Sequence, residues 1–151
     1  MVNENIIIWG LDLGTKTLGI AHNIGQFAFP FKTIKFIEYD FEDCVKKLEI
    51  LMLTIEIPNI VVIGYPINMN ATVGKRAEMV IMFIETYLTK LQNKFTFGIT
   101  KIDERLTTKM ALSIMHQSNT KFKTKNKEWK QKKDEVAAQL ILESFLRQQK
   151  P

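Results

Sequence analysis

The sequence is poor in the residues that bind soft metals or form covalent cross-links. It contains one cysteine, Cys44, which excludes an internal disulfide. That cysteine lies at an apolar position of a predicted helix, where we expect a small core residue rather than a nucleophile. The two histidines, His22 and His116, lack the spacing of a metal-binding motif and are expected to be plain surface or turn residues.

Long apolar runs are also missing. No apolar segment approaches the roughly 18 residues needed to cross a bilayer, and no basic segment or small-residue cleavage site marks a secretory signal at the N-terminus. The chain has 151 residues, of which 46% are hydrophobic and 25% charged. We therefore predict one globular domain, residues 1–151, with a cytoplasmic location and no membrane partner.

Acidic residues are scarce in one segment, residues 118–133. Seven lysines lie there against a single acid, Glu128, while the whole chain carries a formal net charge of +5. A basic segment on a nearly neutral body predicts a local contact with a polyanion such as nucleic acid. A solvated lysine-rich loop without a ligand fits the composition equally well.

The pattern of apolar residues predicts an α/β fold. Short apolar or alternating runs predict strands at 6–11, 17–23, 26–37, 59–64 and 95–102. Helical spacing predicts helices at 41–56, 75–92 and 134–149. Thr107 or Thr108 could cap a further short helix that ends at about residue 117. Pro30 suits an edge strand because it lacks an amide donor, and Asp40 is a candidate helix N-cap. We predict a five-stranded mixed sheet, three antiparallel strands followed by parallel strands, with helices on both faces.

Asp12 interrupts the first apolar run, in the stretch IIIWGLDLGTKTLGIA from Ile6 to Ala21. Alternation along a strand places Asp12 on the same face as Ile8 and Gly10. An ionised carboxylate beside a core is costly unless it is paired or binds a metal. Asp12 could equally cap the following turn. A strand followed by Asp-x-Gly-Thr also resembles the first phosphate loop of the sugar-kinase, chaperone and actin superfamily.

Two further carboxylates are expected near Asp12. Glu104 follows the last predicted strand, and Asp134 begins the last predicted helix on the same face as Ala137 and Ala138. Ligands of open α/β sheets gather beyond the carboxyl ends of parallel strands, where these acids would lie. Clustered carboxylates need a cation to stay ionised, and oxygen ligands select Mg²⁺ or Mn²⁺. Two such ions about 3.5–4 Å apart suit phosphodiester hydrolysis.

Basic and polar residues around these acids would offset their repulsion of nucleic acid. Arg105 could instead pair with Asp103 or Glu104, and Trp129 and Phe122 could either stack on bases or pack against the body. The residues expected to contact nucleic acid are Lys16, Asn68, Lys75, Arg76, Arg105, Thr107, Lys130, Lys132 and Lys133.

Four segments, in this order and spacing, closely resemble the YqgF (RuvX) family of RNase H-like nucleases. They read GLDLGTKTLGIA, VVIGYPINMNATVGKRAE, DERLTT and KDEVAAQLILESFL. The resemblance implies an RNase H-like fold and a metal-dependent nuclease that processes the 5′ end of pre-16S rRNA, with ribosomal particles among its partners. Older descriptions of the family assign Holliday junction resolution to it. By motif matching, the acidic triad of the family falls on Asp12, Glu104 and Asp134.

The chain departs from the family pattern at several positions. Thr17 stands where an arginine is usual, and Ala71 stands where a glycine is usual. The Ser-Asp pair that commonly follows the second strand is not evident at His22 and Asn23. The acidic triad is intact, so these differences bear on substrate contacts more than on chemistry.

Four functions fit the sequence to different degrees. The first is a two-metal nuclease acting on structured RNA, and the second is the same chemistry on four-way DNA junctions. Two symmetric cuts at a junction require a homodimer, whereas the first function is open to a monomer. A non-catalytic nucleic-acid-binding protein is the third. An actin-like ATPase ranks last, because that architecture needs two such domains and this chain holds one.

Overall fold

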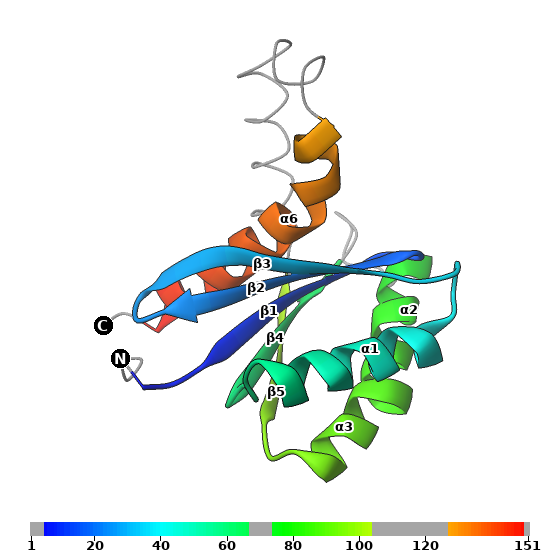
Figure 1. The fold of residues 1–151 in the computed structure, drawn as a ribbon, viewed down its shortest axis with the longest axis horizontal. Helices are drawn as coiled ribbons and strands as arrows, with labels where there is room; N and C mark the ends of the chain where they lie inside the picture. The colour runs from blue at the N-terminus through cyan, green and yellow to red at the C-terminus, as the bar shows by residue number, and fades with distance from the viewer. Residues whose placement is uncertain (1–4, 67–73, 104–126, 150–151) are drawn as a thin grey trace.

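The computed structural model describes residues 5–66, 74–103 and 127–149, with the backbone alone at 127–131. A five-stranded sheet in the order β3-β2-β1-β4-β5 forms its centre (Figure 1). Three strands form an antiparallel meander, namely β1 (Ile8–Leu13), β2 (Thr17–Ile24) and β3 (Phe27–Lys35). β4 (Ile60–Tyr65) pairs parallel with β1, and β5 (Gly98–Asp103) pairs parallel with β4. The predicted mixed sheet is confirmed.

Helices cover both faces of this sheet, as predicted (Figure 1). On one face lie α1 (Phe41–Thr54), α2 (Lys75–Phe83), the π-helical turn η1 (Ile84–Leu88) and α3 (Thr89–Lys94). The opposite face carries α6 (Lys127–Gln148). Within the described ranges, no helix is both long and apolar enough to span a membrane.

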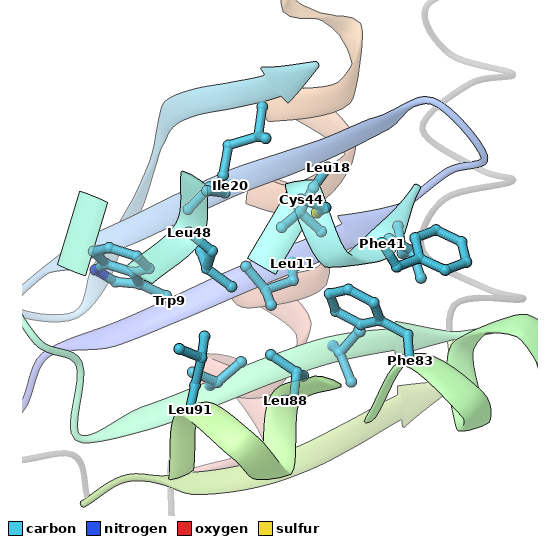
Figure 2. Close-up of a cluster of buried hydrophobic side chains, with 14 of the residues drawn as sticks. Trp9, Leu11, Leu18, Ile20, Phe41, Cys44, Leu48, Phe83, Leu88 and Leu91 are labelled. Carbon is cyan, nitrogen blue, oxygen red and sulfur yellow. The ribbon is translucent and has the colours of Figure 1, made fainter. Parts of the chain in front are cut away.

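The larger core lies between the sheet and α1 to α3. Alternation along β1 sends Trp9, Leu11 and Leu13 to this face, where they meet Phe41 and Leu48 of α1 (Figure 2). Each large side chain buried there contributes about 1.5–3 kcal/mol to the free energy of folding. The predicted N-cap of α1 is confirmed, because the Asp40 carboxylate accepts a hydrogen bond from the Asp43 amide at 3.1 Å.

Cys44 is fully buried in this core, as predicted (Figure 2). Burial raises the pKa of its thiol to about 12, because the thiolate would lose its hydration there. The thiol is therefore protonated at neutral pH and serves as a small apolar group.

The second core lies between the sheet and α6. Ile8 and Val62 face Ala138, Ile141 and Leu142 in this cluster. Gly10 is the point of closest approach in β1, since a Cβ placed there would lie 2.8 Å from the Ala138 carbonyl oxygen and 2.9 Å from the Leu142 Cβ. The helix backbone therefore lies almost directly on the strand.

β3 is an edge strand, as Pro30 predicted. Ile20 pairs with Lys32, but the next residue, Ala21, pairs with Pro30, so Phe31 is an extra residue opposite β2. This bulge bends the edge and interrupts its hydrogen-bonding pattern, which protects an exposed edge from pairing with another chain.

Two predicted helices differ from the structure. The helix predicted at 75–92 is interrupted by η1. Ile81 and Ile84 are only partly buried, although helical spacing within 75–92 predicts them on the core-facing side of the helix. Leu88 is buried as predicted, and Phe83, which the helical spacing did not include, is buried with it. These two residues lie five positions apart, and a π turn brings that spacing onto one face where an α-helix cannot. Strand boundaries also differ by one to three residues, as at β1 and β5.

The prediction that Asp134 begins the last helix is wrong. α6 starts at Lys127, so Asp134 lies in its second turn rather than at its N-terminus. The preceding residues, KEWKQKK, are mostly strong helix formers, and they extend the helix over residues 127–133, the last part of the lysine-rich segment that was predicted as a loop. The predicted shared face is confirmed, because Ala137, Ala138 and Ile141 are all buried.

Candidate functional site

The carboxyl ends of the parallel strands β1, β4 and β5 lie side by side at one end of the sheet. Leu11 in β1 is level with Ile63 in β4, and Ile63 is level with Lys101 in β5. Asp12 follows Leu11 directly. Strand β5 ends at Asp103, which pairs with Tyr65 of β4. This end of the sheet is where the sequence predicted the acidic centre.

Asp12 is positioned by the middle strand of the sheet and points to the α6 face, the face of Gly10. Its side chain is only 12% exposed. An Asp12 carboxylate oxygen accepts a hydrogen bond from Nη2 of Arg76 at 3.1 Å, and the two form an ion pair. The guanidinium comes from the first turn of α2 and is itself half exposed. The nearly buried charge therefore has the partner that its environment requires.

Asp134 is brought beside Asp12 by Gly19. In the β1–β2 pairing, Gly19 lies directly opposite Asp12. A Cβ placed on Gly19 would overlap the carbonyl of Asp134 and lie 3.0 Å from the Asp134 Cβ, so the helix occupies the space that a side chain would fill. Cβ atoms of directly opposed strand residues are about 4.5–5.5 Å apart, so the Cβ of Asp12 lies about that far from the Cβ position of Gly19. Because the Asp134 Cβ lies 3.0 Å from that same position, the side chains of Asp12 and Asp134 begin close together.

The third predicted acid, Glu104, lies outside the described residues. So do Asn68, Arg105 and Thr107, together with the side chain of Lys130. Over the described part of the chain, no group of three or more His, Cys, Asp or Glu residues could hold a metal ion.

Two members of the predicted metal site are thus present in the described structure. Asp12 and Asp134 supply carboxylate oxygens from a rigid strand and from a helix packed on it, and such ligands suit hard cations such as Mg²⁺ or Mn²⁺. The donor chemistry fits the predicted ions. A complete set still requires Glu104, the residue directly after the last residue of β5.

Four lysines among the predicted nucleic-acid contacts have exposed side chains in the described structure. Lys16 lies in the β1–β2 turn, and Lys75 opens α2. Lys132 and Lys133 directly precede Asp134 in α6. The structure thus places these lysines on the elements that carry the two acids or their partner, while Arg76 contacts Asp12 itself.

A hydrogen-bonded attachment of α6 to the edge strand was missed by the sequence reasoning. Thr33, which pairs with Gly19, donates from its hydroxyl to a Glu135 carboxylate oxygen at 3.0 Å. One turn later, the Gln139 side-chain amide donates to the Ala28 carbonyl at 3.0 Å. The i, i+4 spacing of Glu135 and Gln139 signals a shared helix face, but the strand positions opposite them depend on the fold.

Lys35 is a second residue that the sequence reasoning missed. It pairs with Thr17 at the end of β3, two residues beyond Thr33 and therefore on the same face of the sheet. Its side chain is exposed. The alternation of Thr33 and Lys35 within the predicted strand was the available signal, and it places one more lysine on the face that carries Asp12 and Asp134.

His22 and Asn23 have structural roles toward the other end of β1. His22 is not a plain surface or turn residue, because it lies in β2 and its ring stacks on Phe31 with centroids 4.3 Å apart. The Asn23 side chain accepts from the Ile8 amide at 2.7 Å and donates to the Ile6 carbonyl at 2.9 Å. His116 lies outside the described residues.

Comparison with known families and curated proteins gives consistent matches. A family model described as "RuvX: Holliday junction resolvase" matches residues 6–148. A protein of Mycoplasma capricolum subsp. capricolum is 44% identical over 143 residues, covering 95% of this chain and 96% of the relative. A Geobacillus protein is 38% identical over 141 residues, covering 92% and 96%. Both relatives carry the name "Putative pre-16S rRNA nuclease".

Solved structures show the same fold at low sequence identity. RuvC of T. thermophilus, in complex with a Holliday junction substrate, gives a TM-score of 0.60 at 11% identity and covers 96% of this chain and 97% of its own. The yeast mitochondrial Holliday junction resolvase Ydc2 gives 0.54 at 12% identity, covering 97% and 80%. These similarities confirm the predicted RNase H-like fold.

Proposed function

Because the chain belongs to the RuvX family, we propose that it is a metal-dependent nuclease that processes the 5′ end of pre-16S rRNA in the cytoplasm. The observation that carries the proposal is the packing of Asp134 on Gly19, directly opposite Asp12. That packing brings two carboxylates together from the first strand and the last helix, beside exposed lysines. The names of the relatives support the RNA substrate.

Asp12 and Asp134, together with Glu104, would hold two divalent ions, Mg²⁺ or Mn²⁺. When bound, such ions lower the pKa of a coordinated water and stabilise the leaving alkoxide. Asp12 would be a fixed ligand in this set, because its nearly buried carboxylate is held by β1. The chain contributes a strand and a helix packed closely on that strand.

The surrounding lysines would hold the RNA backbone. Lys16, Lys35, Lys75, Lys132 and Lys133 are exposed around the two acids, and their charges would offset the repulsion between carboxylates and phosphates. Such contacts read no base and position the strand only. The 5′ end would therefore be selected by the shape of the precursor or by its ribosomal particle.

The test is cleavage of a pre-16S rRNA fragment by the wild type and by Asp12→Asn, with Mn²⁺, with Mg²⁺ and with chelator. We expect metal-dependent cleavage by the wild type, and none by the variant, because the amide is a much weaker metal ligand. RNA affinity in chelator should remain close to that of the wild type.

Asp40→Asn is the matched control, because asparagine caps a helix as well as aspartate and Asp40 lies at the start of α1. It should cleave like the wild type. Cleavage by Asp12→Asn at the wild-type rate would contradict the proposal. Salt-sensitive binding of RNA without any cleavage would instead favour a non-catalytic nucleic-acid-binding protein.

Holliday junction resolution is the second candidate, because it is the description of the matching family. The same acids would cut DNA, and symmetric cleavage of a four-way junction would require two copies of the site. A four-way DNA junction incubated in parallel separates the two candidates. Paired symmetric cuts by a dimer, with no cleavage of the rRNA fragment, would favour the resolvase.

A further inference from the structure

Arg76 and Asp12 form the ion pair at the centre of the candidate site. We propose that Arg76 is a positioning residue, the resident counter-ion of Asp12, which a divalent metal must displace in order to bind. The inference rests on the proposed function, since it takes Asp12 as a metal ligand. It adds that, in the protein without metal, Asp12 is already paired with Arg76. The affinity of the protein for metal would therefore depend partly on this arginine.

The two partners compete for the same atoms. Nη2 of Arg76 donates to an Asp12 carboxylate oxygen at 3.1 Å, and a hard divalent cation would need carboxylate oxygens of the same group. The guanidinium carries a positive charge beside the carboxylate for as long as the side chain stays there. A divalent metal ion that approaches Asp12 would therefore find one carboxylate oxygen already hydrogen-bonded and would be repelled by the guanidinium charge.

The geometry also indicates which partner moves. Asp12 is 12% exposed and belongs to the middle strand of the sheet, whose neighbouring residues are fully buried. The Arg76 side chain is 50% exposed and reaches the site from the first turn of α2. Displacement by a metal would thus withdraw the long, exposed side chain and leave the carboxylate in place. Before that step, the ion pair keeps the carboxylate oriented toward the site.

The experiment measures Mn²⁺ affinity of the full chain directly, by electron paramagnetic resonance of free Mn²⁺ without nucleic acid. Wild type, Arg76→Gln, Lys75→Gln and Asp12→Asn are compared, with circular dichroism to check folding. Lys75→Gln is the matched control, because it removes the same charge from the adjacent position of α2. We expect Arg76→Gln to bind Mn²⁺ about two- to fivefold more tightly than the wild type, the range of a partly exposed ion pair. Lys75→Gln should change affinity by less than about twofold, because its exposed charge is screened.

Two outcomes would overturn the inference alone. The first is that Arg76→Gln binds Mn²⁺ no more tightly than the wild type. The second is that Lys75→Gln gains as much Mn²⁺ affinity as Arg76→Gln. In both cases Asp12→Asn must still bind less metal than the wild type. Binding that does not depend on Asp12 would overturn the proposed function, and this inference with it.

A second measurement follows Arg76 itself. In ¹⁵N-labelled wild type, the Nε–Hε signal of Arg76, assigned by its loss in Arg76→Gln, should shift as Mg²⁺ is added and should saturate with the metal site. A signal that stays unchanged while Mg²⁺ saturates the site would show that the ion pair persists, and would contradict the displacement.

Discussion

At the scale of single residues, Gly19 matters because it has no side chain. The backbone of Asp134 occupies the volume that a Cβ would need. Backbone atoms cannot move aside as a flexible side chain can, so any larger residue must push α6 away from β2. The distance between Asp12 and Asp134 thus depends on a residue that carries no functional group.

We expect Gly19→Ala to lower the free energy of unfolding by about 1–3 kcal/mol, the usual effect of forcing an extra methyl group into a packed contact. Mn²⁺ affinity and RNA cleavage should fall as well, because the two carboxylates separate. Chemical denaturation and the Mn²⁺ titration measure both effects.

Gly98→Ala is the control for this substitution. A Cβ on Gly98, at the start of β5, would meet no atom within 4 Å. Its stability should stay within about 0.5 kcal/mol of the wild type. If the free energy of unfolding fell equally in the two variants, the effect would come from replacing a glycine as such and not from the contact with Asp134.

At the scale of elements, the position of α6 depends on hydrogen bonds to the edge strand as well as on apolar packing. Apolar contacts permit a helix to slide or rotate, whereas the bond from Thr33 to Glu135 selects one arrangement. Glu135 follows Asp134 directly, so this bond should orient the turn that carries the proposed metal ligand.

We expect Thr33→Val to reduce the free energy of unfolding by about 1 kcal/mol, because one partly buried hydrogen bond is lost. Mn²⁺ affinity should fall with it, since the turn bearing Asp134 gains freedom. Thr54→Val serves as the control, because it removes a threonine hydroxyl bonded to the Ile50 carbonyl at the end of α1. If both variants bound Mn²⁺ like the wild type, the Thr33 bond would not position Asp134.

The helices also show what the sequence could and could not predict. α1 was predicted closely, because its cap and its apolar spacing are both local signals. The π turn depends on which side chains the sheet accepts, and periodicity fits Ile81 and Ile84 as well as the residues that are buried. The start of α6 was missed because Asp134 looks like an N-cap when only its neighbours are considered.

The same division holds for the candidate site. Asp12 could be predicted as a site residue because a charge inside an apolar run requires a partner. The ends of the predicted elements, and then the family motifs, predicted Glu104 and Asp134. The pair with Arg76, the contact of Asp134 with Gly19 and the position of Lys35 could not be predicted. They join segments that are distant in the chain, so they follow from strand order and register.

At the scale of the whole molecule, positive charge on the face that carries the acids should govern nucleic-acid binding. We expect Lys35→Gln to weaken RNA binding and to reduce the slope of log affinity against log salt by about 1, as for one lost phosphate contact. Lys46→Gln, on the outer surface of α1, should leave the slope unchanged. Fluorescence anisotropy at several salt concentrations in chelator measures both. Identical slopes for the two variants would argue against Lys35 as an RNA contact.

The order of elements along the chain has a consequence for synthesis on the ribosome. The sheet, with Asp12 in its first strand, precedes α6, which supplies Asp134 and packs on one face of the sheet. A nascent chain that has produced β1 to β5 therefore lacks one wall of its core and one of the two neighbouring acids. On the proposed function, the chain would gain nuclease activity only after α6 has been made and has packed on the sheet.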